Sequence, residues 1–512
     1  MAVLSNWRKA LLATVFTGAA LASSAVLAET LNVMQSEGPR SMDPGDQSAT
    51  YTNALLAPVY EGLLARTSDL SLAPALATEW TIDETGTIYT FKLREGVVFH
   101  DDTPFNAEAV VYNFERHLST ERGLAASGRI RTILAGIEAL DDYTVQFTLK
   151  SPYPAFLNIL TTNGAMIVSP TADAAGTVGA FSVGIGPYEL VEYKSGEFVA
   201  QTKFDGYWGD NAASVDDIRW TWTSEPSVLA MALQTGDADV INPAPAAFAQ
   251  VIQANPDLNL SVTDGSAVFW VALNTESEEL KDVRVRQALN FATDRDGLVQ
   301  AITNGYADPA NSPLARIAEG YNPDLNPYPL DLDKARELLA EAGFPNGFTM
   351  SVVVQEQESR IAEALQAMWA QVGVTLDVRR MESGVWSAAA FADAAQKATE
   401  GTDAVIASWS SGVNGPDLQF RPLYHSASAA PTSANLGFYN NPEFDRLLDE
   451  AAAMTDETAR NEVYGQLQEI VNEDAPMVLL YVLKDLVGYR DGVEGVWTVP
   501  GGMVRVDTAI KN

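Results

Sequence analysis

Polar and hydrophobic positions alternate most regularly between residues 87 and 93. Tyr89 and Phe91 stand two positions apart there, and this period of two is typical of a half-buried strand with an aromatic face. A second short apolar run occupies residues 97–99 after a turn, so the two runs are expected to form a hairpin. Asn106 then stands where a helix needs its N-terminal cap, and a helix is expected to begin there.

Strand and helix periodicities alternate along the rest of the chain. Strands are predicted at 30–35, at two positions within 130–150, and at 215–222, 268–273, 348–355, 374–380 and 476–489. Helices are predicted at 51–60, 227–235, 333–343, 360–372 and within 442–472. This β-α-β rhythm predicts an α/β fold, and 512 residues are enough for two to four domains.

The first 28 residues have the pattern of a secretory signal peptide. Arg8 and Lys9 precede an apolar run over residues 10–21, and small residues follow up to Ala28. A membrane anchor is the alternative, but the apolar run is shorter than the ~20 residues that a membrane-spanning helix needs. Residues 1–28 are therefore expected to be removed after export.

The chain contains no cysteine. No lipid can be attached at a cysteine and no disulfide can form, so packing alone must stabilise the fold. An exported protein without a lipid anchor is expected in the periplasm of a bacterium with two membranes.

Acidic residues outnumber basic ones by 67 to 32, which gives a net charge of −35. This charge argues against nucleic acid and anionic membranes as partners. The acidic residues are scattered and no EF-hand loop is present, so a solvated anionic coat is favoured over a metal site, and neither metal nor cofactor is expected.

Catalytic motifs are also missing from the sequence. The histidines are His100, His117 and His425, and a Ser–His–acid triad could be imagined only around His425. No G-x-S-x-G elbow and no H-E-x-x-H motif occurs. An enzyme is therefore not expected, and a secreted hydrolase stays a remote alternative.

One long string resembles a known family signature. The residues Y-T-F-x-L-R-x-G-V-x-F-H-D-x-x-P-F-N-A, from Tyr89 to Ala107, resemble the signature of the extracytoplasmic solute-binding proteins of peptide and nickel ABC transporters. Asp102 stands where that family usually has glycine. Further landmarks are Y-E-x-L at 60–63, L-x-P-x-L-A-x-x-W at 72–80, and D-x-R-V-R-Q-A-L-N at 282–290. The resemblance extends from about residue 41 to the C-terminus.

The resemblance implies an α/β fold of two lobes, the large peptide-binding type of periplasmic binding protein, with an extra β-rich subdomain in the first lobe. The expected parts are lobe I at 29–273 with its subdomain at about 75–200, lobe II at 274–484, and a return to lobe I at 485–512. Hinges are expected near 273–275 and 481–485.

Residues 404–417 are expected to reach the ligand, because a buried strand leads there into Trp409 and a glycine-rich loop. Peptide binders of the family have W-x-x-D at this place, where the Asp pairs with the α-ammonium of the peptide. Gly412 replaces that Asp, and Ile406 replaces an upstream Arg. The string W-S-S-G-V-N-G-P-D instead resembles the glutathione-binding branch. Predicted ligand contacts are Trp409, Ser410, Ser411 and Asn414, followed by Tyr51, Arg360 and Asp417.

The family resemblance implies a monomeric substrate-binding component of an ABC importer. It would bind a short peptide (dipeptide, oligopeptide or glutathione-like) between its lobes and deliver it to a membrane permease without changing it. The same fold could carry a non-peptide cargo, such as a nickel chelate, haem, an opine or a sugar, since fold does not fix the ligand.

Overall fold

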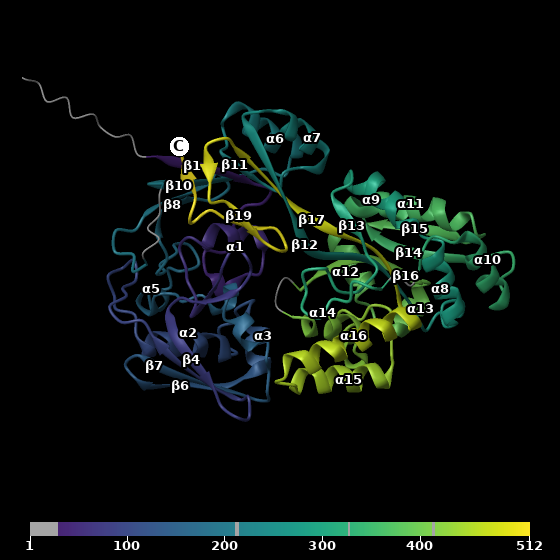
Figure 1. Cartoon of the computed structure of the whole chain (residues 1–512), viewed down its shortest axis with the longest axis horizontal. Helices are drawn as coiled ribbons and strands as arrows, with labels where there is room; N and C mark the ends of the chain where they lie inside the picture. The colour runs from purple at the N-terminus through teal and green to yellow at the C-terminus, as the bar shows by residue number, and fades with distance from the viewer. Residues whose placement is uncertain (1–28, 210–214, 326–327, 412–414) are drawn as a thin grey trace, which may run out of the picture.

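The computed structural model describes residues 29–209, 215–325, 328–411 and 415–512. The predicted signal peptide and Asn414 lie outside these residues. Two lobes stand side by side in Figure 1: one contains the purple-to-blue elements and the other the green ones, and two long strands run between them. The predicted two-lobed α/β fold is therefore confirmed.

The connecting strands are β12 (Leu258–Leu273) and β17 (Met477–Arg490), which pair antiparallel. The pairing shifts register between Asp264 and Val268. Before this shift β12 contributes Leu258 to a hydrophobic cluster of lobe I, and after it contributes Trp270 to the core of lobe II. The predicted buried strand 268–273 is thus the second half of a longer strand that passes from one lobe into the other (Figure 1).

Both strands belong to an 11-stranded sheet that extends through both lobes, in the order β15-β14-β16-β12-β17-β11-β1-β10-β9-β8 with β13 beside β17. Lobe I contributes β1 (Thr30–Gln35), β8 (Tyr188–Lys194), β9 (Phe198–Lys203), β10 (Asp217–Trp222) and β11 (Val240–Asn242). Lobe II contributes β13 (Ala307–Pro309), β14 (Thr349–Gln355), β15 (Thr375–Met381) and β16 (Ala404–Ser410).

Helices pack around these sheet segments. In lobe I they are α1 (Thr50–Leu56), α4 (Phe156–Ile159), α5 (Pro170–Ala174), α6 (Pro226–Thr235) and α7 (Ala249–Ala254). In lobe II they are α8 (Val283–Phe291), α9 (Arg295–Thr303), α10 (Leu332–Glu341), α11 (Ser359–Ala370), α12 (Ser383–Ala390), α13 (Ala394–Glu400), α14 (Asp417–Tyr424), α15 (Pro442–Ala453) and α16 (Glu457–Asp474). Among the described helices, none combines the length and the apolar character that crossing a membrane requires.

The helix predicted at 51–60 is shorter, because α1 ends at Leu56. Ala57 still has helical backbone angles, but Pro58 has no backbone N–H and cannot continue the helical hydrogen bonds. The chain then turns, and Tyr60 and Glu61 just after it line the cavity described below.

A separate four-stranded sheet forms the β-rich subdomain. Its strand order is β4 (Ala77–Ile82), β5 (Ile88–Leu93), β7 (Thr144–Leu149) and β6 (Leu134–Asp141). It carries α2 (Ala107–Leu118) and α3 (Ser127–Ile133). The aromatic face of β5 is confirmed, since Phe91 is fully buried and meets Phe147 edge-on at 5.5 Å. The cap at Asn106 is confirmed as well, because its side chain accepts a hydrogen bond from the backbone N–H of Ala109.

The predicted hairpin between 87–93 and 97–99 is wrong. Both edges of β5 are already paired, with β4 on one side and β7 on the other. Val98 forms only an isolated bridge with Pro104, across a tight turn in which Asp102 has a φ of 61°. The short run therefore closes a loop of its own and does not extend the sheet.

Three further small sheets are formed by segments close together in sequence or at the chain end. They are β2 (Leu64–Arg66) with β3 (Leu72–Pro74), β18 (Val493–Glu494) with β21 (Ile510–Lys511), and β19 (Trp497–Val499) with β20 (Met503–Arg505). The chain thus returns to lobe I after β17, and β20 packs beside α1 there.

Candidate functional site

A cavity of about 570 Å³ lies between the two lobes. Most of its wall belongs to lobe I: the region of α1 and β2, the ends of α3 and α4, and the loop between β19 and β20. Lobe II contributes Ser410 and Ser411, at the end of β16. The volume lies in the range of small-molecule sites, which is roughly 300–1,000 Å³.

The lobes also touch outside the cavity. A β-carbon placed at Gly86 would lie 3.4 Å from Cγ2 of Thr455, and one placed at Gly415 would lie 3.8 Å from Cβ of Ala155. Each pair joins a segment of lobe I to a segment of lobe II. The structure therefore shows an arrangement in which the lobes meet around the cavity.

Among the described residues, four charged ones line this cavity: Glu61, Arg66, Arg129 and Arg505. Glu61 accepts hydrogen bonds on both carboxylate oxygens. Burial raises the pKa of Glu61 to about 7, although these two hydrogen bonds oppose the rise. Its charge is therefore only partly present near neutral pH.

The three arginines differ in how they are held. Arg505 forms an ion pair with Asp507, with 2.7 Å between Nε and Oδ1. Arg66 donates hydrogen bonds to the carbonyl oxygen of Leu70 and to Oδ1 of Asn158, at 2.7 and 2.9 Å. Arg129 is exposed on α3 and forms no ion pair with another described residue.

Ser410 lies where three parts of the molecule meet. Its Oγ is 2.5 Å from Oγ of Ser266, which lies in the register shift of β12. Gly501, in the loop between β19 and β20, would place a β-carbon 3.4 Å from both hydroxyl oxygens. Its backbone N–H donates to Asp485 of β17 at 2.9 Å. The lobe II end of the cavity is thus tied directly to both connecting strands.

The structure brings only part of the predicted site together. Ser410 and Ser411 line the large cavity, and Asp417 lines a smaller one of about 210 Å³, where it pairs with Arg421. Trp409 donates its indole N–H to the carbonyl oxygen of Leu418 at 2.9 Å and packs on the lobe II core.

Other predicted contacts lie apart from the wall of the large cavity. Tyr51 is next to the lining residue Thr50 on α1 but is not itself part of the wall. Arg360 is exposed on α11 and donates to the carbonyl oxygen of Ala301 within lobe II. Asn414 lies outside the described residues. The ligand contacts assigned from the sequence therefore stay predictions.

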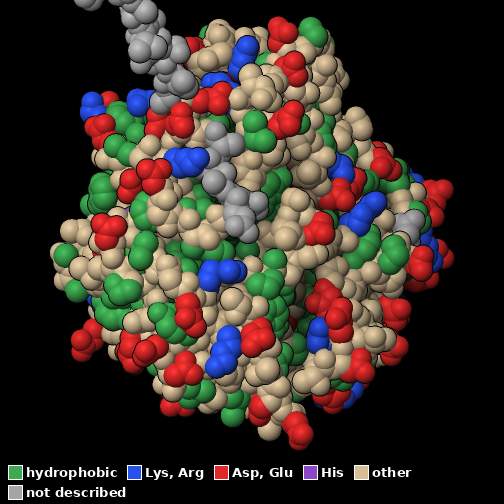
Figure 2. Space-filling view, turned by 60° about the vertical axis from the view of Figure 1, so that its left-hand side comes forward, with side chains coloured by type: hydrophobic (Ala, Val, Ile, Leu, Met, Phe, Trp, Pro, Cys, Tyr) green, Lys and Arg blue, Asp and Glu red, His purple; other side chains and the backbone are tan. Residues whose placement is uncertain are grey.

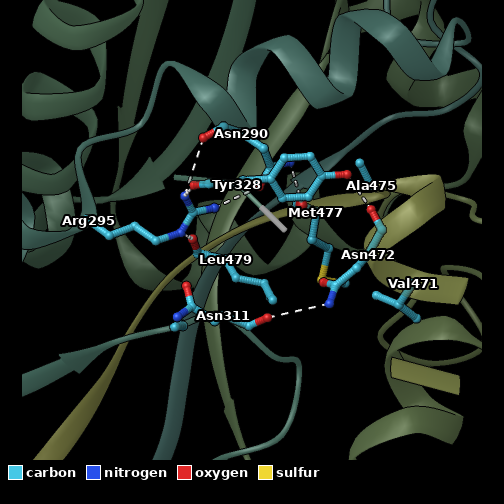
Figure 3. A pocket seen from close by; sticks show the side chains of 10 residues that line it. Asn290, Arg295, Asn311, Tyr328, Val471, Asn472, Ala475, Met477 and Leu479 are labelled. Atoms are coloured by element: carbon cyan, nitrogen blue, oxygen red, sulfur yellow. Dashed lines mark hydrogen bonds between the residues drawn. The ribbon is translucent and has the colours of Figure 1, made fainter. Parts of the chain in front are cut away.

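Another, much smaller cavity lies inside lobe II and is shown in Figure 3. Its volume is about 10 Å³, which is room for a single water molecule. The guanidinium of Arg295 donates to the carbonyl oxygen of Leu479 at 2.7 Å and to Oδ1 of Asn290 at 2.8 Å. These bonds attach α8 and α9 to β17, so we assign this place a structural role.

The residues around His425 do not form a catalytic triad. Nδ1 of His425 accepts a hydrogen bond from the backbone N–H of Ala427, whereas the hydroxyl of Ser426 donates to Asp445. The serine proton therefore points to the carboxylate and not to the imidazole. No cluster of three or more His, Asp or Glu side chains able to hold a metal is found in the described part of the chain.

Comparisons with known proteins identify the family. The family model described as bacterial extracellular solute-binding proteins, family 5 Middle, matches residues 71–431. The chain belongs to the family 5 solute-binding proteins. The glutathione-binding protein GsiB of Pectobacterium atrosepticum is 32% identical to it over 514 residues, which cover 99% of each chain.

Solved structures of similar proteins agree with the fold. HbpA2 from Haemophilus parasuis has a TM-score of 0.84 and 28% identity, and the match covers 94% of this family 5 protein and 100% of HbpA2. DppA from Helicobacter pylori, solved in complex with the peptide STSA, has a TM-score of 0.79 and 28% identity over 94% and 98% of the two chains.

The charged lining of the cavity was missed in the sequence. Glu61 belongs to the Y-E-x-L landmark, but the sequence did not indicate that its side chain lines a cavity. Arg66, Arg129 and Arg505 belong to segments far apart in the sequence, and no local pattern marks them as neighbours.

Proposed function

We propose that this protein is the periplasmic substrate-binding component of an ABC importer. It binds a short peptide between its lobes and delivers it to the membrane permease. The observation that carries the proposal is a cavity of about 570 Å³ between two lobes that two long strands connect. Relatives whose names or titles give glutathione or a peptide as ligand support a peptide as cargo.

The distribution of the cavity wall suggests an order of events. Because lobe I supplies most of the lining, the ligand first settles on lobe I, and lobe II then closes over it through Ser410 and Ser411. A ligand that contacts both lobes binds the closed state better than the open one, and this difference drives closure. Small backbone rotations in the connecting strands suffice for such a motion.

We place the bending point at the register shift of β12, between Asp264 and Val268, where regular pairing with β17 is interrupted. The hinges predicted at 273–275 and 481–485, and the lobe boundaries drawn from them, stay predictions. Residues 1–28 are proposed to direct export to the periplasm, where the chain acts as a monomer. The ligand leaves chemically unchanged, so this role is not enzymatic.

Binding and turnover are tested together with glutathione and a set of dipeptides. Isothermal calorimetry and thermal unfolding should show binding with at least one peptide, and saturation near 100 times the dissociation constant should add about 2.7 kcal/mol to the free energy of unfolding. Chromatography of the recovered ligand should find it intact. Hydrolysis of the peptide, or binding by none of them, would contradict the proposed function.

A further inference from the structure

The charge of the cavity wall is opposite to that of the whole chain. Acidic residues outnumber basic ones by 67 to 32 overall, and the face shown in Figure 2 carries many scattered acidic side chains. The charged residues of the cavity wall are instead three arginines and one glutamate. A cleft that carries one sign of charge between low-dielectric walls concentrates ligands of the opposite charge.

The single acidic residue of this wall is poorly placed to hold an ammonium group. Oε1 of Glu61 already accepts from the hydroxyl of Tyr207 at 2.7 Å, and Oε2 accepts from the indole N–H of Trp208 at 2.8 Å. No other acidic residue is among the described residues that line the cavity.

Two arginines place a positive charge on separate segments of the lobe I wall, although the guanidinium of Arg66 also donates to Leu70 and Asn158. Arg66 lies at the end of β2, and Arg129 lies on α3 and has no acidic partner among the described residues. Arg505 is already neutralised by Asp507. Carboxylates bind a guanidinium through charge-assisted hydrogen bonds, which are about twice as strong as neutral ones.

From this arrangement we propose that the cavity selects a peptide-sized anion, whose carboxylates outnumber its ammonium groups and are held by Arg66 and Arg129. This inference rests on the proposed function and narrows its ligand class. A dipeptide with a neutral side chain carries one carboxylate and one ammonium and lacks the extra anionic group. A peptide with an acidic side chain has it.

A pair of nearly isosteric dipeptides tests the charge preference. Ala-Glu and Ala-Gln have almost the same shape and differ by one negative charge. Calorimetry at pH 7.5 should give a dissociation constant at least tenfold lower for Ala-Glu, or about 1.4 kcal/mol. Equal affinities, or tighter binding of Ala-Gln, would overturn the inference and leave the proposed function standing. Binding of neither peptide, nor of glutathione, would overturn both.

Variants of the two arginines test whether they cause the preference for Ala-Glu over Ala-Gln. Arg129→Gln should weaken Ala-Glu about tenfold and change Ala-Gln less than about twofold, since only the charge-assisted contact is lost. Arg131→Gln is the matched control, because Arg131 lies on the same helix, outside the cavity wall, and donates to the carbonyl oxygen of Ser119. Its preference should equal that of the wild type. An unchanged preference in both Arg129→Gln and Arg66→Gln would overturn the assignment, and unfolding midpoints show that each variant is folded.

Discussion

Glu61 shows how one residue can serve the fold and the cavity together. Its carboxylate joins the start of the lobe I wall to Tyr207 and Trp208, which lie far along the chain. The guanidinium of Arg94 lies over the Trp208 ring at 4.2 Å, so the indole is held at one face and at its N–H. The rings of Tyr207 and Trp208, with centroids 5.4 Å apart, also contact each other beside the carboxylate.

The pKa of Glu61 leads to a prediction about stability. The pKa is raised from 4.5 to about 7, mainly by burial. Folding therefore favours the protonated form, and the resulting stabilisation is full below about pH 4.5 and is lost as the pH rises to about 7. Glu61→Gln removes this titration. Relative to the wild type, its free energy of unfolding should rise by roughly 1 kcal/mol or more as the pH increases from about 4.5 through about 7, and level off about one unit above that.

Urea denaturation at several pH values measures this difference. Burial lowers the pKa values of His100 and His117 to about 4, so the stabilisation of the fold that their neutral forms provide is lost as the pH falls from about 6.5. Both histidines titrate alike in the variant and the wild type, so their effects cancel in the difference. Arg505 and its partner Asp507 also act on the Glu61 carboxylate. Both residues are present in the variant as in the wild type. The same difference between variant and wild type at pH 5 and at pH 8 would contradict the prediction.

Single residues also show which parts of the cavity wall could be predicted from the sequence and which could not. The serines beside Trp409 were predicted because a buried strand ends there, and strand ends are visible in the sequence. Arg66 and Arg129 were not, because a lone arginine in a strand or on a short helix has no distinctive spacing. Only the tertiary fold brings them to one wall, together with Arg505 from the end of the chain.

Among the elements, β12 and β17 carry the connection between the lobes. Gly265 lies in the register shift of β12, and a β-carbon there would lie 2.2 Å from the carbonyl oxygen of Leu483 on β17. No side chain fits without moving one strand away from the other. The close approach of the two backbones therefore depends on glycine.

Gly265→Ala should lower the free energy of unfolding by about 1–3 kcal/mol, because overpacking pushes the strands apart. Gly136→Ala is the matched control, since that glycine also lies in a strand, β6, and its β-carbon would meet nothing within 4 Å. The control should change stability by less than about 0.5 kcal/mol. Thermal and urea unfolding of both variants measure the effects, and equal values for the two would refute this account of Gly265.

Elements with a local signature were predicted well, and those that depend on distant partners were not. β1 was expected at 30–35 and found at Thr30–Gln35, and the helix expected at 227–235 was found as α6, Pro226–Thr235. The predicted hairpin after β5 is wrong because both edges of this strand are taken, one by the preceding strand β4 and the other by β7, which lies far along the chain.

At the scale of the whole molecule, the contacts between the lobes predict a change of shape on binding. In the structure the turn at Gly86 approaches Thr455 and the segment at Gly415 approaches Ala155. If ligand holds this arrangement, the ligand-saturated protein should have a smaller radius of gyration than the ligand-free protein. Small-angle X-ray scattering measures both, and superimposable profiles would argue against closure.

The last wall of the cavity comes from late in the sequence. The loop between β19 and β20 and Arg505 line the cavity, beside segments that precede them by hundreds of residues. A nascent chain that has emerged only as far as β17 therefore has an incomplete pocket. The complete binding site therefore forms only when synthesis is nearly finished. A chain that is still being synthesised or exported does not yet bind the ligand.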